Sequence, residues 1–69
     1  MDKETIKLIR KSYNLNQRNF AKMVNCSFSL IALVEIGKRR VTENLESKIR
    51  EAFQLNEQKI NEMNSLFYQ

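Results

Sequence analysis

The side chains best suited to binding chemistry in this 69-residue chain form two short groups, roughly twenty residues apart. Residues 16–18 (Asn-Gln-Arg) offer amide and guanidinium donors, and residues 38–40 (Lys-Arg-Arg) form a run of three cations. Such donors bind phosphate oxygens, and each cation that neutralises a phosphate makes binding more dependent on salt. These two groups therefore predict a surface for a polyanion.

The chain lacks the residues that most enzymes need. It contains no His, and its single Cys26 has no neighbouring base that would activate a thiol. No carboxylate pair falls on a shared face in a predicted pocket, and no His/Cys cluster has the spacing of a metal site. We predict neither enzymatic activity nor a metal or cofactor, and we interpret Cys26 as a small packing residue rather than a redox sensor.

Charge is unevenly distributed along the sequence. The net charge is +4, with nine Lys/Arg and three Asp/Glu in residues 1–40, against three and five in residues 41–69. A basic half of this kind favours contact with a polyanion. No apolar run approaches the roughly 18 residues of a membrane span, and residues 1–12 lack the apolar middle of a signal peptide. We expect a soluble, cytoplasmic protein without a membrane partner.

The elements that must position these groups are predicted to be helices. The chain has no Pro and one Gly, Gly37, whereas strands joined by tight turns usually need more of both. Good N-cap residues precede each apolar periodic segment, at Asp2, Asn16, Ser27, Thr42 and Asn56. The segments they introduce are a helix of roughly three turns after Asp2, then 17–24, 28 to about 36, 43–53 and 57–67.

Breaks between the helices use residues that tolerate turn conformations. Asn25 suits a left-handed backbone, and Gly37 suits the position that ends a helix. The residues predicted to face the core share helical spacing and are Ile6, Ile9, Tyr13, Phe20, Ala21, Val24, Ile31, Val34, Glu35, Leu45, Ile49, Ala52, Phe53, Ile60, Met63 and Phe67, with Leu55 as an anchor between helices.

A family resemblance extends this interpretation. The pattern Leu15-x-Gln17-x-x-Phe20-Ala21, followed by Asn25, Ser27, Ile31 and Glu35-x-Gly37-Lys38-Arg39, resembles the Cro and phage-repressor type of helix-turn-helix, the Xre family. The resemblance implies an all-α fold, a single compact five-helix domain over residues 1–69, with the helix-turn-helix at 17–36. It also implies a double-stranded DNA-binding transcriptional regulator, repressor-like and of phage or mobile-element type, located at the nucleoid.

The resemblance assigns roles to individual residues. Residues 28–36 would enter the major groove, where base edges carry a distinctive pattern of donors, acceptors and methyl groups. Gln17 would meet a phosphate at the start of its helix, and residues 38–40 would follow the DNA backbone. The full set of predicted DNA contacts is Asn16, Gln17, Arg18, Ser27, Phe28, Ser29, Leu33, Lys38, Arg39 and Arg40.

Glu35 is predicted to have a structural role. A carboxylate on the inward side of a helix needs a partner, because an unpaired buried charge is strongly destabilising. Arg10 matches the position that pairs with this Glu in some phage repressors. We therefore expect an Arg10–Glu35 ion pair in the core.

The outward face of segment 28–36 departs from the family. It carries Phe28, Ser29, Ala32 and Leu33, where relatives usually offer hydrogen-bonding side chains, and Leu30 lies at its flank. Three interpretations are open. In the first, the apolar residues contact thymine methyl groups. In the second, Phe28, Leu30 and Leu33 bind a protein partner, as in an anti-repressor. In the third, Phe28 or Leu30 partly enters the core, and Arg18, Asn19 and Lys22 make more of the contacts that recognise the DNA sequence.

Specific binding by so small a domain normally needs two copies on half-sites about one helical turn apart. The last helix and the tail, with Leu66, Phe67 and Tyr68, offer a surface for a homodimer. The alternative is that this tail closes the core. Both interpretations are open at the level of sequence.

Overall fold

Five α-helices, separated by short turns, make up the part of the chain that the structure describes. The computed structural model describes residues 1–67, and its helices are α1 (Lys3–Ser12), α2 (Gln17–Val24), α3 (Phe28–Glu35), α4 (Glu43–Phe53) and α5 (Glu57–Phe67). The predicted all-helical chain is confirmed, with one small correction. α3 ends at Glu35 rather than at about Ile36, because Ile36 is already its C-cap.

Side-chain capping explains where each helix begins. Asp2, Asn16, Ser27 and Thr42 each accept a hydrogen bond from the backbone N–H three residues further on. Asn56 does the same for the N–H of Lys59, over 2.8 Å. Each cap satisfies one of the N–H groups that a helix start leaves unpaired, and replacing one by Ala costs about 1 kcal/mol.

Left-handed residues explain where α2 and α3 end. Asn25 has φ 63° and Gly37 has φ 84°, as their residue types predict. Beyond α3, the N–H of Gly37 donates to the carbonyl of Val34, and the N–H of Lys38 donates to that of Leu33. These two bonds form the Schellman arrangement that satisfies the last carbonyls of a helix. Residues 38–40 follow directly after this turn.

The core combines apolar residues from all five helices. The side chains exposed by 8% or less are Ile6, Leu8, Ile9, Phe20, Ala21, Val24, Ile31, Val34, Leu45, Ile49, Phe53, Leu55, Ile60 and Met63. Tyr13 and Ala52, predicted to be inside, are half-buried. Leu8 was not predicted, and it is buried because α1 is covered by both α3 and α5 and therefore buries more than one stripe.

Aromatic stacking joins three helices inside this core. The ring of Phe53 on α4 stacks on Tyr13, at the end of α1, with centroids 4.5 Å apart, and on Phe20 of α2 at 5.5 Å. Each such pair contributes about 0.5–1.5 kcal/mol beyond the burial of its surface. These contacts orient α2, which begins the candidate site, relative to α1 and α4.

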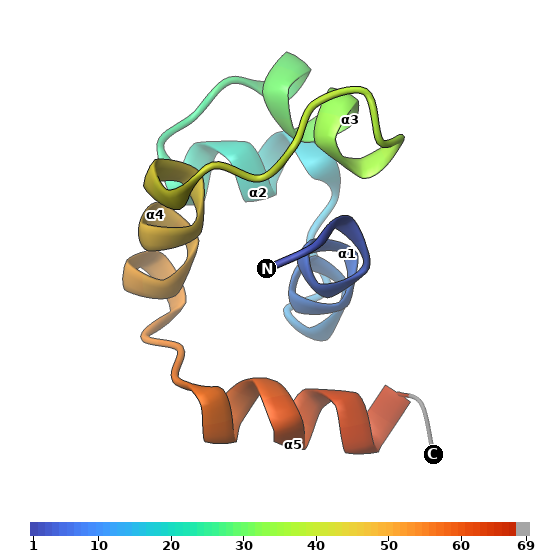
Figure 1. The fold of residues 1–69 in the computed structure, drawn as a ribbon, viewed down its shortest axis with the longest axis vertical. Coiled ribbons are helices and arrows are strands. Elements are labelled where there is room, and N and C mark those ends of the chain that lie inside the picture. The colour runs from blue at the N-terminus through green and yellow to red at the C-terminus, as the bar shows by residue number, and fades with distance from the viewer. Residues whose placement is uncertain (68–69) are drawn as a thin grey trace.

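The helices are arranged with α2 and α3 at one end and α5 at the other, as Figure 1 shows. α1 and α4 lie between these ends, and the chain from Gly37 to Thr42 crosses from α3 back to α4. The Cα radius of gyration is 11.1 Å, close to the roughly 11 Å of a compact chain of this length. Within residues 1–67, no helix combines the length and hydrophobicity of a membrane span.

The predicted tail surface is described only in part. Leu66 is 80% exposed, so this residue does not close the core. It lies beside a shallow depression between α1 and α5 that Tyr13, Lys59 and Met63 also line. The side chain of Phe67 and all of Tyr68 lie outside the described residues.

Candidate nucleic-acid interface

The turn between α2 and α3 places the starts of these two helices relative to each other. The left-handed Asn25 is followed by Cys26, whose N–H donates to the carbonyl of Ala21 over 3.0 Å. Ser27 then caps α3. Lys48 of α4 donates to the carbonyl of Asn25 over 3.3 Å. Cys26 is half-buried against the core, and this burial raises the pKa of its thiol, as suits a packing residue.

The start of α2 presents unpaired donors to solvent. The Asn16 side chain accepts from the N–H of Asn19 over 2.7 Å. The N–H groups of Gln17 and Arg18 have no acceptor within the described chain, as is usual for the first turn of a helix. A depression beside this turn is lined by Lys11, Asn14, Leu15, Asn16, Asn19 and Arg10. The positive end of the α2 macrodipole lies beside this depression, and helix starts of this kind are suited to anionic oxygens.

Of the six residues that line this depression, Asn16 alone is among the ten predicted DNA contacts. Lys11 belongs to the last turn of α1, and Asn19 to the first turn of α2. Asn19 is one of the three α2 residues that the third interpretation names, and it lies on the same turn as Asn16. Lys11 is there because the short turn between α1 and α2, whose residues Asn14 and Leu15 also line the depression, follows it closely.

A hydrogen-bonded network around the buried Glu35 ties α1, α2 and α3 together. Glu35, at the end of α3, is 2% exposed, and Arg10 donates to both of its carboxylate oxygens, over 2.7 and 2.9 Å. Arg10 also donates to the carbonyl of Leu15 over 3.1 Å. The expected Arg10–Glu35 ion pair is therefore present, with the two-pronged geometry that makes Arg–carboxylate contacts strong.

Gln17 belongs to the same network, which the sequence did not indicate. Its side-chain amide donates to Glu35 over 3.1 Å. One of its two amide hydrogens is thus used internally, which leaves one hydrogen and the carbonyl oxygen for another partner. Burial disfavours the charged carboxylate, but the hydrogen bonds from Arg10 and Gln17 outweigh it and lower the pKa of Glu35 below its usual value.

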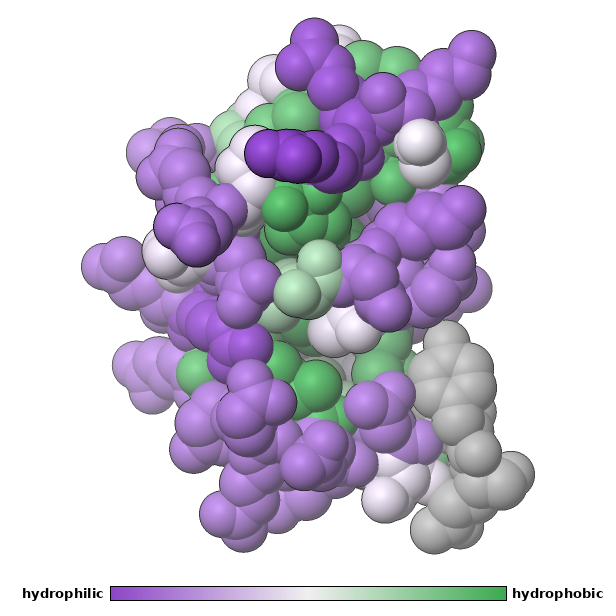
Figure 2. Space-filling model, in the orientation of Figure 1, coloured by the Kyte–Doolittle hydropathy of each residue, from purple (hydrophilic) through white to green (hydrophobic). Residues whose placement is uncertain are grey.

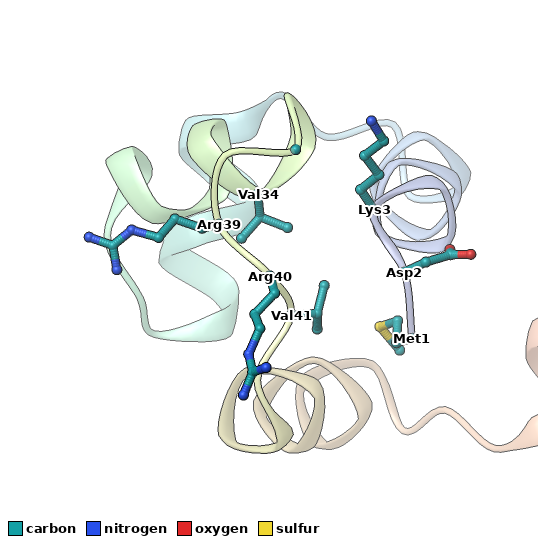
Figure 3. Close-up of a pocket in the computed structure, with 8 residues that line it drawn as sticks. Met1, Asp2, Lys3, Val34, Arg39, Arg40 and Val41 are labelled. Carbon is teal, nitrogen blue, oxygen red and sulfur yellow. The ribbon is translucent and has the colours of Figure 1, made fainter.

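The three cations after α3 are exposed and have no carboxylate partner within the described chain. Figure 3 shows Arg39 and Arg40 directed away from the depression that they border, while Val34 and Val41 point into it. Lys3 reaches from α1 toward the same turn, so that its Nζ lies 3.2 Å from where a Cβ on Gly37 would stand. The positive charges of these side chains also interact favourably with the negative end of the α3 macrodipole.

Acidic side chains are almost absent from the segment that contains α2, α3 and the following loop. Glu35 is the only acid between Glu4 and Glu43, and Arg10 neutralises it in the core. Over the same segment the surface exposes Lys11, Arg18, Lys22, Lys38, Arg39 and Arg40. The segment from α2 to the loop after α3 is therefore strongly positive, and the exposed Asp2, which precedes α1, lines the same depression as Arg39 and Arg40.

The outward face of α3 is apolar, with differences from the prediction. Phe28 is 41% exposed and Ser29 is exposed, whereas Ala32 and Leu33 are half-buried. Leu30 is half-buried and packs against the core, as the third interpretation expected for Phe28 or Leu30, so it is not available as a free flank of this face. Ile36, 62% exposed, continues the face one turn beyond Ala32 and was not predicted.

One contact between side chains of α2 and α3 lies at the start of this face. The guanidinium carbon of Arg18 lies 4.8 Å from the centroid of the Phe28 ring, a cation–π contact between α2 and α3. Figure 2 shows hydrophobic and strongly hydrophilic residues side by side at the end of the molecule that α2 and α3 form. The contact between Arg18 and Phe28 places a cation directly against the first residue of the apolar face of α3.

The ten predicted contact residues lie at the start of α2, at the start and middle of α3, and in the loop after α3. All three segments lie at the same end of the molecule, whereas Leu66 belongs to α5 at the opposite end (Figure 1). In residues 1–67, no group of three His, Cys, Asp or Glu side chains is placed to hold a metal ion. No family model, curated protein or solved structure matches the chain.

Proposed function

We propose that this chain is a transcriptional regulator that binds double-stranded DNA through a helix-turn-helix of the phage-repressor type. α3 enters the major groove and α2 crosses the DNA backbone. The observation that carries the proposal is the separation of charge. Six exposed cations and no exposed carboxylate lie between Glu4 and Glu43, and the one acid in that segment, Glu35, is buried and paired. A polyanion is the partner that such a surface attracts.

The geometry at the helix ends supports the same conclusion. Free N–H groups at the start of α2 and the exposed run Lys38–Arg40 suit phosphates on a DNA backbone. Gln17 is held by Glu35, so its remaining amide groups are oriented rather than free to rotate. Phosphate contacts of this kind set the position of a protein on the duplex without reading its sequence.

Salt dependence tests this function. Binding to mixed-sequence duplex DNA is measured at about 50 and about 200 mM salt, where phosphate contacts change affinity steeply. We expect micromolar or tighter binding at the lower salt. The triple variant Lys38→Ala/Arg39→Ala/Arg40→Ala should bind more weakly, with a slope of log affinity against log salt that is flatter by up to about 2.7 units.

A control variant separates local contacts from net charge. Gln58→Glu, Asn61→Asp and Asn64→Asp together lower the net charge by the same three units, at exposed positions on α5 that are far from α3 and outside the depression beside Leu66. This variant should retain most of the affinity. Loss of binding in this control equal to that of the triple variant would argue for non-specific attraction. No binding by the folded wild type at low salt would refute DNA binding.

The exposed apolar residues support a second candidate, a repressor-like module that binds a protein. Phe28 is 41% exposed, and Leu33, further along the outward face of α3, is half-exposed. Exposed apolar surface of this kind often marks a protein contact. Leu30, packed against the core, contributes little to such a patch. A protein-binding module predicts weak salt dependence and loss of its partner when Leu33 is changed to Asp.

A homodimer on DNA completes the proposal. One domain of this size contacts a single half-site. Two copies on adjacent half-sites together give the DNA-sequence specificity that is usual for such regulators. Leu66, 80% exposed on α5, belongs to the proposed self-association surface. Analytical ultracentrifugation of the protein with a two-half-site duplex should give two chains per duplex. A monomer mass that persists on DNA at high protein concentration would refute the dimer.

A further inference from the structure

The outward face of α3 has almost no capacity to hydrogen-bond to a base. Of the residues along it, Ser29 alone has a polar side chain, and the others are Phe28, Ala32, Leu33 and Ile36. Hydrogen-bond readout of the kind that Arg, Asn or Gln provides is therefore unavailable there. An apolar face in the major groove needs a base with an apolar group.

Thymine is the one standard base that meets this condition. Its C5 methyl group stands in the major groove, whereas the other three bases present only donors, acceptors and C–H edges there. Contact between this methyl group and an apolar side chain removes both from water, which is favourable. Ala, Thr and Phe side chains are the kinds that make such contacts.

We propose, on the basis of the DNA-binding function above, that Phe28 and Leu33 recognise thymine methyl groups and that the preferred half-site is thymine-rich where α3 faces it. DNA is favoured over a protein as the occupant because cations border the apolar residues. Arg18 lies against Phe28, Lys38–Arg40 follow α3, and α3 itself exposes no carboxylate. Phosphates flank the major groove on both sides and match that arrangement.

The Arg18–Phe28 contact supports the role of the ring. The guanidinium, 4.8 Å from the ring centroid, restrains Phe28 at the first position of α3. Recognition helices contact base edges with their N-terminal residues. A ring already held there loses less conformational freedom on binding, which is the advantage of a preorganised contact. Arg18 is thus a positioning residue for Phe28 as well as a cation near the backbone.

Single-atom changes in the DNA test the proposal. A preferred duplex is first selected from a random pool with the wild-type protein. Each thymine in it is then replaced by deoxyuridine, which removes only the methyl group. We expect about a fourfold loss of affinity at each contacted thymine, the value of one buried methyl-sized group. Replacing such a T·A pair by C·G should also weaken binding, and 5-methylcytosine at that position should recover part of the loss.

Protein variants assign the contacts. Phe28→Ala and Leu33→Ala should each weaken binding to the selected duplex and abolish sensitivity to deoxyuridine at one position. Met23→Ala is the matched control, because Met23 is apolar and 52% exposed on α2 but lies outside this face. It should keep the wild-type affinity and the full pattern of methyl sensitivity.

The possible results separate this inference from the proposed function. Salt-dependent binding that is unaffected by deoxyuridine at every position, or a selection without preferred thymines, would overturn methyl recognition and leave DNA binding standing. Folded protein that binds no duplex at low salt would overturn both and direct the search toward a protein partner for the face of α3. Methyl sensitivity that disappears position by position in the two variants would establish the proposal.

Discussion

The side-chain amide of Gln17 donates a hydrogen bond to the buried carboxylate of Glu35 over 3.1 Å, which joins the first residue of α2 to the last residue of α3. Because Arg10 holds the same carboxylate, the geometry of the proposed DNA-facing surface depends on an ion pair in the core. Stability and binding are therefore coupled through three residues, and variants at each should separate the two.

Arg10→Met should destabilise the fold by about 3 kcal/mol, because it leaves the Glu35 carboxylate buried without its ionic partner. Thermal unfolding followed by circular dichroism gives the measurement. The neighbouring Lys11→Met is the control, since Lys11 is exposed, and should change the stability by less than about 0.5 kcal/mol. An unchanged melting temperature in Arg10→Met would show that the pair contributes little.

The double variant Arg10→Met/Glu35→Leu makes this test sharper. Replacing both members of a buried ion pair with apolar residues is often neutral, whereas removing one is costly. We expect the double variant to recover most of the stability that Arg10→Met loses. A double variant as unstable as the sum of the two single variants would place the cost in packing rather than in the unpaired charge.

Glu35 should also make the free energy of unfolding depend on pH in the acidic range. Its pKa is lower in the folded chain than in the unfolded chain, so the unfolded chain binds the proton more readily. Its contribution is present above the unfolded value of about 4.3 and is lost as the pH falls through the lower folded pKa. Glu35→Gln should therefore be less stable than the wild type at pH 7, and should lose less stability between about pH 5 and pH 3.

Urea unfolding at a series of pH values measures this difference. Asp2 and Glu46 also have lowered pKa values in the folded chain, from a hydrogen bond to the backbone N–H of Thr5 and from a bond with the terminal ammonium, respectively. Some acid dependence should therefore remain in Glu35→Gln. Identical pH profiles for Glu35→Gln and the wild type would mean that Glu35 does not contribute to the linkage.

Gln17→Ala should lower both stability and DNA affinity. It removes one hydrogen bond to Glu35, worth about 1 kcal/mol, and one candidate phosphate contact. We expect several-fold weaker binding at low salt by a protein that is still folded. Gln58→Ala is the control, because Gln58 makes an exposed bond to Glu62 on α5, at the other end of the molecule. It should change neither property, and equal losses in both variants would contradict a local role for Gln17.

Gly37→Ala should destabilise the chain by about 1–2 kcal/mol, the cost of holding a non-glycine residue in the left-handed region. Gly37 has φ 84°, and an added Cβ would stand 3.2 Å from Nζ of Lys3, the mobile end of a long side chain. Denaturant unfolding measures the loss. Lys3→Ala in the same background should not restore the stability if backbone strain is the cause, and full recovery would identify a steric clash instead.

Local features of the sequence were sufficient to predict the helices. Caps at Asp2, Asn16, Ser27 and Thr42 and the left-handed residues Asn25 and Gly37 act through hydrogen bonds to residues only a few positions away. Periodicity identified most of the core for the same reason, since residues spaced by three or four share a helix face. The Arg10–Glu35 pair, 25 residues apart, was predicted only through the family resemblance, and the structure contains it.

What the sequence by itself determined is therefore the set of helices, their ends and the position of the cations along the chain. Only the tertiary structure decided which faces are covered. Leu8 is buried because α5 as well as α3 packs on α1, Leu30 turns toward the core, and Ile36 is left in solvent. The Gln17–Glu35 bond and the Arg18–Phe28 contact likewise join helices whose relative placement no local pattern specifies. The physical reason is that hydrogen bonds within a helix depend on neighbours in sequence, whereas burial and pairing depend on which helix lies opposite.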